Sequence, residues 1–150
     1  MSNIKLNQIF KTVCIASDHA GYKLKEVIKN HLVDRNVSVY DVGPYTNQSV
    51  DYPDYAKKLG NRIKLKKSDV GILVCGSGTG MAISANKIKT IRAAVCYNLR
   101  STRLSRQHNN ANIIALGSRL TKKKLSLKLV ENFLKTKFEG GRHLKRIKKI

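Results

Sequence analysis

The sequence contains no tryptophan, and aromatic residues make up only 6% of its 150 positions. Proteins that bind single-stranded nucleic acids stack the bases on aromatic side chains, so this scarcity weighs against that class. No run reaches the roughly 18 apolar residues that span a bilayer. The first residues, MSNIKLNQIFKTVCIAS, lack the layout of a secretory signal because lysines interrupt their short apolar run. We therefore expect a soluble protein of the cytoplasm.

Cysteine is also scarce, and its three positions, Cys14, Cys75 and Cys96, form no CxxC or Cys/His pattern. An odd number without such spacing argues against a disulfide framework and against structural zinc. Two of these cysteines lie inside apolar runs, which is typical of buried thiols. Cysteine usage therefore agrees with an intracellular protein that has no structural metal.

Acidic residues are the third scarcity, since 9 Asp and Glu stand against 30 Lys and Arg and give a formal net charge of +21. Such a charge attracts polyanions, so a nucleic-acid-binding protein remains an alternative. Most of the charge is lysine scattered through the chain, rather than arginine interleaved with aromatics. This distribution favours a lysine-rich composition without a nucleic-acid role.

Short apolar runs alternate with segments of helical periodicity along the whole chain. We predict strands at 12–17, 37–43, 70–75, 92–96 and 111–117, and helices at 20–35, 55–67, 81–89, 99–109 and 121–138. Continuous apolar strands are typical of parallel strands covered by helices on both faces. The prediction is an α/β, Rossmann-like three-layer sandwich whose five-stranded parallel sheet has the order 2-1-3-4-5. One domain spans 1–150, with a short N-terminal extension (1–10) and a basic C-terminal tail (139–150).

Polar residues follow the strands that flank the point where the predicted strand order reverses. Asp18 and His19 follow the first strand, and the third strand ends at Cys75. Ligands of open parallel sheets bind beyond the carboxyl ends of the strands at this point, so we expect these side chains in one crevice. A helix N-cap is the alternative role for Asp18.

A glycine-rich loop follows Cys75 and consists of Gly76, Ser77, Gly78, Thr79 and Gly80. Glycines allow close approach of a ligand, and the helix that follows presents free N–H groups to an anion. The loop lacks the Gly-Lys-Ser/Thr of a phosphate-binding P-loop, and a plain tight turn remains an alternative. A Cys75 thiolate there could remove a proton next to a carbonyl while the loop N–H groups hold the enediolate; a packed strand-end cysteine is the other reading.

Two further groups lie away from this predicted crevice. His108 and Asn109 precede the fifth strand, at the opposite rim of the sheet, so His108 is either structural or serves the site of a neighbouring subunit. Arg142 and Arg146 are four residues apart and would project from the same side of a helical turn. Two guanidinium groups at this spacing suit a phosphate, and a solvated basic tail is the alternative.

Taken in order, these segments resemble the ribose-5-phosphate isomerase B family, a group that includes galactose-6-phosphate isomerase subunits and allose-6-phosphate isomerase. The matching stretches are SDHAGYKLK, DYPDYA, CGSGTGMAISANK, IRAAVCYN, LSRQHNNANIIALGSR and FEGGRH. The resemblance covers roughly 11–146. It implies a metal-free and cofactor-free aldose–ketose isomerase of the pentose phosphate pathway, converting D-ribose 5-phosphate and D-ribulose 5-phosphate through a cis-enediolate. A six-carbon sugar phosphate is the alternative substrate.

The same resemblance implies a role for each candidate residue. Cys75 would be the base and the loop 76–80, with the Ser77 hydroxyl, would hold the enediolate. The remaining assignments are substrate binding for Asp18 and His19, ring opening for His108 with Asn109 beside it, and sugar-phosphate contacts for Arg119, Arg142 and Arg146. The family implies a homo-oligomer, dimer or tetramer, with sites shared between subunits.

The sequence also departs from the family. Ser77 stands where many members carry threonine, which keeps the hydroxyl. Met81 stands where one branch carries a glutamate base, so Cys75 is the only base of the two. The chain begins several residues before the usual family start, and its positive charge is unusually high.

Overall fold

Strands and helices alternate along the computed structural model, which describes residues 5–150; the first part of the expected N-terminal extension, 1–4, lies outside the described residues. The elements are β1 (Thr12–Ser17), α1 (Tyr22–Val33), β2 (Ser38–Gly43), α2 (Tyr52–Lys64), β3 (Val70–Cys75), α3 (Thr79–Ala85), β4 (Ala93–Val95), α4 (Leu99–Gln107), β5 (Ile113–Gly117), α5 (Lys123–Lys135) and α6 (Arg142–Ile147). All pairings within the sheet are parallel. The predicted α/β class and five-stranded sheet are therefore confirmed.

The strands are hydrogen-bonded in the order β2-β1-β3-β5-β4, so the predicted order 2-1-3-4-5 is wrong for the last two strands. The two strands differ in how much apolar surface they bury. β5 is buried along all of its residues, whereas β4 has the sequence Ala-Ala-Val and is half-buried throughout. A strand with continuous apolar side chains gains most from an interior position. The short β4 accordingly lies at the edge, and β5 pairs with both β3 and β4.

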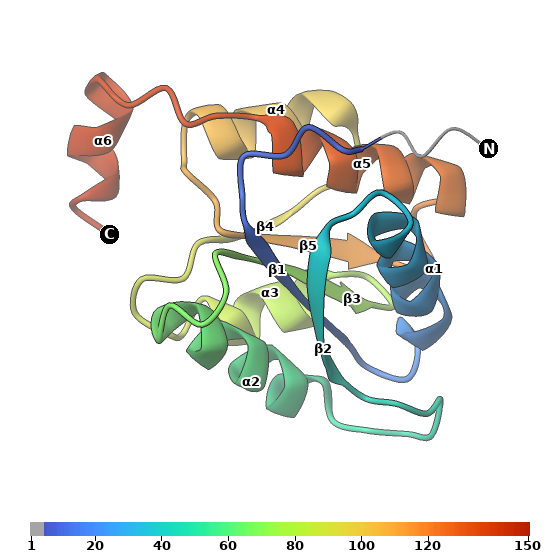
Figure 1. Cartoon of the computed structure of the whole chain (residues 1–150). Helices are drawn as coiled ribbons and strands as arrows, with labels where there is room; N and C mark the ends of the chain where they lie inside the picture. Colours follow the sequence, from blue (N-terminus) through green and yellow to red (C-terminus); the bar gives the residue numbers. More distant parts are fainter. Residues whose placement is uncertain (1–4) are drawn as a thin grey trace.

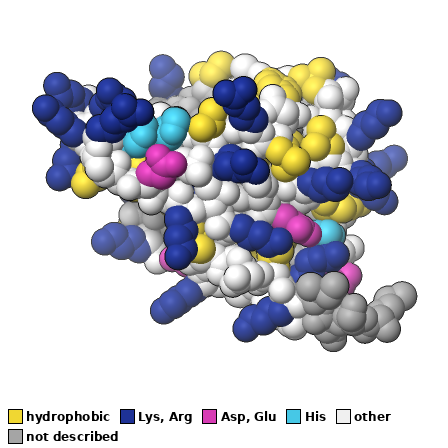
Figure 2. Space-filling model, turned by 90° about the horizontal axis from the view of Figure 1, so that it is seen from above, with side chains coloured by type: hydrophobic (Ala, Val, Ile, Leu, Met, Phe, Trp, Pro, Cys, Tyr) yellow, Lys and Arg dark blue, Asp and Glu magenta, His cyan; other side chains and the backbone are white. Residues whose placement is uncertain are grey.

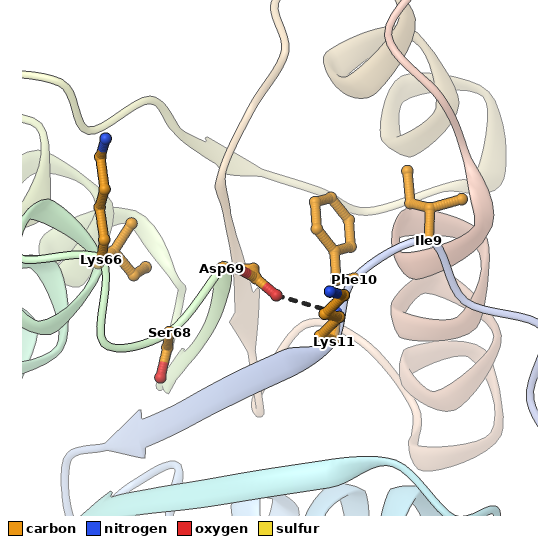
Figure 3. A pocket seen from close by; sticks show the side chains of 7 residues that line it. Ile9, Phe10, Lys11, Lys66, Ser68 and Asp69 are labelled. Carbon is orange, nitrogen blue, oxygen red and sulfur yellow. Dashed lines mark hydrogen bonds between the residues drawn. The ribbon is translucent and has the colours of Figure 1, made fainter.

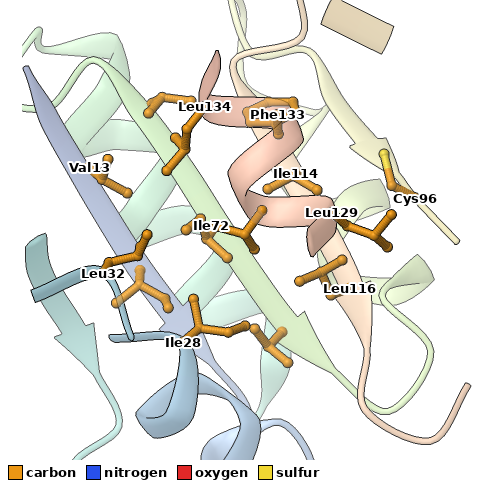
Figure 4. Packing of buried hydrophobic residues seen from close by; sticks show 14 of the residues in the cluster. Val13, Ile28, Leu32, Ile72, Cys96, Ile114, Leu116, Leu129, Phe133 and Leu134 are labelled. Carbon is orange, nitrogen blue, oxygen red and sulfur yellow. The ribbon is translucent and has the colours of Figure 1, made fainter. Parts of the chain in front are cut away.

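Helices cover both faces of the sheet in three layers. α1, α4 and α5 lie on one face and α2 and α3 on the other (Figure 1). Successive side chains of a strand point to opposite faces, so β3 sends Ile72 into one cluster and Leu73 into the other. In the first cluster Ile72 packs with Ile28 of α1 and Phe133 of α5 (Figure 4).

The start of the chain is part of this packing. Leu6 is buried in the first cluster, and the N–H of Ile9 donates to the carbonyl of Leu134 on α5 at 3.0 Å. The Asp69 carboxylate then accepts hydrogen bonds from the N–H groups of Lys11 and Thr12, both at 2.9 Å. Figure 3 shows Asp69 beside the hollow at the beginning of β1. Residues 5–10 thus cover the core, a role that the sequence did not indicate.

The C-terminal tail forms α6, which stands away from the sheet (Figure 1). His143 is the buried residue of this helix. Within residues 5–150, no helix combines the length and apolar character needed to cross a membrane.

Candidate active site

The carboxyl ends of β1, β3 and β5 are held together by backbone hydrogen bonds. The N–H of Asp18, just after β1, donates to Val74 of β3 at 3.2 Å. The N–H groups of Ser118 and Arg119, just after β5, donate to the carbonyls of Cys75 and Gly76 at 2.8 and 3.0 Å. Asp18, Cys75 and Arg119 therefore lie along one edge, where Asp18, His19, Cys75 and the glycine loop were expected to meet.

The glycine loop makes a tight turn around the thiol. Gly78 has φ = +79°, in the left-handed region that favours glycine. In this conformation its N–H donates to Cys75 Sγ at 3.1 Å. The exposed side chains of the loop are Ser77 and Thr79, and Ser77 Oγ accepts a hydrogen bond from the N–H of Thr79 at 3.3 Å. The turn thus buries the thiol and leaves hydroxyl groups at the rim.

Two side chains from distant parts of the chain lie over this loop. A methyl group placed on Gly76 would lie 3.0 Å from Nη1 of Arg119, so this guanidinium reaches the loop directly. A methyl group on Gly80 would lie 2.9 Å from the ring of Tyr52. Tyr52 was not among the predicted site residues, although it lies in the quoted DYPDYA segment. The sequence carries no local sign of this contact, because Tyr52 and Gly80 are distant in the chain and only the fold brings them together.

The three cysteines have different surroundings. Burial raises the pKa of Cys14 to about 11 and also raises that of Cys96, so both remain protonated thiols at neutral pH. Cys14 Sγ contacts the carbonyl of Val70, and Cys96 Sγ that of Ala94. Cys75 is also buried, at 4% exposure, but its sulfur accepts a backbone N–H and it borders exposed loop residues. Among the three cysteines, Cys75 therefore has the surroundings expected of a reacting thiol.

Asp18 and His19 are fixed by their neighbours. Asp18 is buried, and its Oδ1 accepts a hydrogen bond from the N–H of Gly21 at 2.9 Å. Asp18 thus shapes the turn before α1, but the N-cap residue of that helix is Gly21, so the alternative role of Asp18 as N-cap is wrong. His19 is exposed, and its Nδ1 lies 3.3 Å from the N–H of Val50. Because a backbone N–H only donates, Nδ1 is the acceptor and a neutral ring carries its proton on Nε2. His19 is thereby prepared to donate a hydrogen bond at the rim.

A buried cation supports the loop that holds Val50. Lys25 of α1 has no exposed surface, and its Nζ donates to Asp41 Oδ1 at 2.9 Å and to the carbonyl of Pro44 at 2.6 Å. Burial alone would raise the pKa of Asp41, but hydrogen bonds from Lys29 and Lys25 hold it below its ordinary value. The segment 44–51, which reaches His19, begins on this anchor.

The second predicted group lies at the other edge of the sheet. α4 starts beside the carboxyl end of β4 and runs back, so His108 and Asn109 at its end lie on the edge opposite Cys75 (Figure 1). Asn109 is exposed, and its backbone carbonyl accepts a hydrogen bond from Nε of Arg92 at 3.1 Å. Within one chain, the described candidate residues therefore lie in two separate groups.

The C-terminal tail lies next to this second group. The rings of His108 and His143 stack with centroids 4.2 Å apart and planes 11° from parallel. Arg142 and Arg146 are exposed, on the same helix as His143. Figure 2 shows histidine and acidic side chains beside a group of Lys and Arg side chains on this part of the surface. The expected cation pair is thus on a helical turn next to His108.

A parallel α/β sheet with a thiol, a glycine loop and polar side chains at its carboxyl edge defines a small-molecule enzyme of the Rossmann-like class. A family model described as Ribose/Galactose Isomerase matches residues 13–150. Ribose-5-phosphate isomerase B of Escherichia coli (strain K12) is 42% identical over 140 residues, covering 93% of this chain and 94% of that protein. A putative sugar phosphate isomerase of Rickettsia bellii is 48% identical over 138 residues, covering 92% and 96%.

Solved structures agree with these relatives. Ribose-5-phosphate isomerase B of Clostridium thermocellum superimposes with a TM-score of 0.91 at 47% identity, over 92% of this chain and 93% of that one. The Mycoplasma genitalium enzyme, solved with bound ribulose-5-phosphate, has a TM-score of 0.88 at 42% identity, over 92% of each chain. The chain belongs to the ribose/galactose isomerase family, and its resemblance to ribose-5-phosphate isomerase B is confirmed. Its enzyme class is that of an aldose–ketose isomerase.

Proposed function

We propose that this protein interconverts D-ribose 5-phosphate and D-ribulose 5-phosphate through a cis-enediolate. The observation that carries this proposal is the Cys75 sulfur, 3.1 Å from the N–H of Gly78, in a glycine loop at the carboxyl edge of the sheet. Family membership supports the substrate class, since relatives of this chain bear the name of the pentose enzyme.

In the proposed reaction Cys75 removes the proton from C2 of the open-chain aldose, and the electron pair forms the C1–C2 double bond. The former aldehyde oxygen becomes an enediolate oxygen, which the loop N–H groups and the Ser77 hydroxyl stabilise. The same thiol then returns its proton to C1, and the proton of the C2 hydroxyl passes to the C1 oxygen, so that C2 becomes the ketone and C1 carries a hydroxyl group. Asp18 and His19 hold the sugar hydroxyls during this exchange. Every atom of the substrate is retained, as isomerisation requires.

The remaining steps need a second chain. Ring opening by His108, with Asn109 beside it, and phosphate binding by Arg142 and Arg146 involve residues at the edge opposite Cys75. Arg119 lies over the glycine loop. It therefore contacts the substrate from the same chain that supplies Cys75. We therefore propose a homo-oligomer, a dimer or a tetramer, in which each site joins the carboxyl edge of one subunit to the tail of another.

Replacing Cys75 tests the base. Purified protein is assayed side by side on ribose 5-phosphate, allose 6-phosphate and galactose 6-phosphate, and ribose 5-phosphate is expected to give the highest kcat/KM. Cys75→Ala is expected to abolish isomerisation and solvent-deuterium incorporation into the product, with an unchanged circular dichroism spectrum. Cys96→Ala, which removes another buried thiol, serves as the control and should retain turnover. A Cys75→Ala enzyme with near-native turnover would remove the thiol from the mechanism.

A further inference from the structure

Three side chains with metal-ligating atoms meet where the C-terminal tail contacts the end of α4. His108 Nε2 lies 3.8 Å from Glu139 Oε2, and His143 Nε2 lies 3.6 Å from the same oxygen. The ligand atoms of all three residues lie within 4.8 Å of one another. Two imidazoles and one carboxylate thus share one small region of the surface.

The backbone brings these residues together independently of their side chains. The N–H of Glu139 donates to the carbonyl of Gln107 at 3.1 Å, which fixes Glu139 beside His108. The N–H of His143 donates to Gly140 at 3.1 Å, which turns the tail so that His143 faces Glu139. The cluster is therefore held by main-chain contacts between two segments that are distant in the sequence.

The side chains of the cluster approach one another without closing a hydrogen bond, since separations of 3.6 and 3.8 Å exceed hydrogen-bonding distance. Elsewhere in the protein His31 and Glu131 show the usual direct pairing, with Nε2 and Oε1 at 2.7 Å. In the cluster, by contrast, two histidine nitrogens lie 3.6 and 3.8 Å from one carboxylate oxygen, which is closer to the spacing of ligand atoms around one metal ion.

We propose that His108, Glu139 and His143 bind one divalent transition-metal ion of the zinc class. Zinc at about 2.0–2.1 Å from each ligand atom requires ligand atoms about 3.3 Å apart, so the cluster must contract by a few tenths of an ångström around Glu139. The stacked imidazole rings must also rotate. In nearly parallel rings the nitrogen lone pairs point in similar directions, whereas two ligands of one ion must direct their lone pairs at the same point. The side chains of His108 and Glu139 are 39% and 49% exposed, which leaves them room to do so. Two histidines and one glutamate leave a fourth coordination position open.

The charges around the cluster act in two directions. Arg142 and Arg146 repel a cation, and Glu139 is the acidic residue of the tail. Because salt screens this repulsion, the affinity should rise with ionic strength, opposite to the behaviour of ions held by exposed carboxylates.

Metal binding at this place has a consequence that rests on the proposed function. A metal on His108 occupies the ring nitrogen that would open the sugar, so Zn²⁺ should inhibit isomerisation of ring-closed substrate, and EDTA should reverse the inhibition. Binding itself does not depend on that function. It is measured directly by the stoichiometry of Zn²⁺ in calorimetry and by the visible absorption of bound Co²⁺.

The experiment titrates the full-length oligomer with Zn²⁺ and Co²⁺ and compares four variants. One ion per chain is expected for the unaltered protein. Glu139→Gln and His143→Asn should each weaken binding by at least roughly tenfold, the lower end of what even an outer-shell partner contributes. His31→Asn is the matched control in the other histidine–carboxylate pair and should bind as the unaltered protein does. Cys75→Ala removes the thiol, which is the alternative ligand for zinc. This variant should also bind one ion, because the proposed site does not include Cys75.

The outcomes separate the two proposals. Loss of the ion in Cys75→Ala, or unchanged affinity in both Glu139→Gln and His143→Asn, would overturn the metal site. Far-ultraviolet circular dichroism shows whether a variant is folded, and if one of the tail variants fails to fold the other gives the answer. A protein that binds Zn²⁺ but isomerises no pentose phosphate would contradict the proposed function while supporting the metal site. An active enzyme that binds no ion would do the reverse.

Discussion

Among single residues, Lys25 is a cation that the fold buries completely. It is among the largest fully buried side chains, and its charge is met by Asp41 and by the carbonyl of Pro44. The Tyr22 and Tyr45 rings also lie within 5.3 and 5.7 Å of the ammonium group. A buried ion that has all of its partners costs little, whereas removal of one partner leaves the other charge unpaired in a poorly solvated place.

We predict that Lys25→Met lowers the free energy of unfolding by about 2–3 kcal/mol, because the carbonyl of Pro44 loses its buried donor and Asp41 keeps only Lys29 as a cationic partner. Urea unfolding at neutral pH measures this change. Lys29→Met is the matched control, since Lys29 contacts the same Asp41 but its side chain is 26% exposed. It should lower stability by no more than about 1 kcal/mol. Equal losses in the two variants would contradict the special role of the buried ammonium group.

The same carboxylate makes stability depend on acid. The pKa of Asp41 in the folded protein lies below its ordinary value of 3.8, so the unfolded chain takes up the proton first as the pH falls. The stabilisation is complete above the unfolded pKa and is lost as the pH falls through the folded pKa. We predict that the free energy of unfolding decreases between about pH 5 and pH 2, and that Asp41→Asn flattens this decrease. Parallel curves for the two proteins in urea titrations would refute the prediction.

At the scale of elements, the strand boundaries were predicted more accurately than the helix boundaries. The ranges 12–17 and 70–75 were predicted as they occur, because continuous apolar runs ending in polar or glycine residues admit few alternatives. Helix boundaries were less accurate. α3 ends at Ala85, before the predicted 89, because the side chain of Asn86 bonds both the N–H and the carbonyl of Ala93. That pairing depends on tertiary structure and leaves no local signal.

The candidate site divides in the same way. Residues that follow strands were predicted together, because the parallel topology places all carboxyl strand ends at one edge. The buried position of Lys25, the ring of Tyr52 over the loop and the contact of His143 with His108 were not predicted. Each depends on two segments distant in the sequence, and a lysine or histidine on a helix has the same local pattern whether it is exposed or buried.

The glycine loop gives the element-scale prediction. Gly78 and Gly140 both have positive φ, +79° and +69°. A methyl group on Gly78 would lie 3.0 Å from the backbone of Leu116, whereas one on Gly140 has nothing within 4 Å. Gly140→Ala should therefore cost only the backbone strain, about 1–2 kcal/mol. Gly78→Ala should cost more and should also displace the N–H that contacts Cys75.

We expect kcat of Gly78→Ala to fall on the order of 100-fold, the typical effect of losing one oxyanion-stabilising donor. Gly140→Ala should leave kcat within a few-fold of the unaltered enzyme when assayed below its melting temperature. Steady-state kinetics and thermal unfolding of the two variants measure both effects. If kcat falls equally in both, the loop geometry around Cys75 does not govern turnover.

For the whole molecule, the proposed function depends on two features, the net positive charge and the separation of the candidate residues into two groups. All 30 Lys and Arg residues lie within the described part of the chain, and in that part only Lys25, Lys29, Arg35 and Lys135 lie within 4.0 Å of a carboxylate. Under the proposed function, the remaining positive charge would raise the local concentration of anionic sugar phosphates. The two groups of candidate residues lie at opposite edges of the sheet, so the proposed site requires a second subunit.

A mixing experiment tests this shared arrangement. Cys75→Ala and His108→Ala are each expected to be inactive on ring-closed substrate, because every site of either homo-oligomer contains one altered half. When the two proteins are unfolded together in equal amounts and refolded, half of the pairs contain one chain of each kind. Such a pair has one site with both changes and one site with neither. The mixture should therefore recover about a quarter of the activity of the unaltered enzyme.

The control for this experiment is a mixture of Cys75→Ala with Ser77→Ala. Both changes lie at the carboxyl edge, so every site of a mixed pair still contains one of them, and the mixture should show no more than about half the activity of Ser77→Ala alone. Activity is measured with ribose 5-phosphate after size-exclusion chromatography has shown that the mixtures have the same oligomeric state. If Cys75→Ala mixed with His108→Ala recovers nothing, the site does not join two chains as proposed. If the control mixture recovers as much, the recovery reflects refolding rather than restored sites. The expected pattern requires that His108 of one subunit lies at the Cys75 thiol of another.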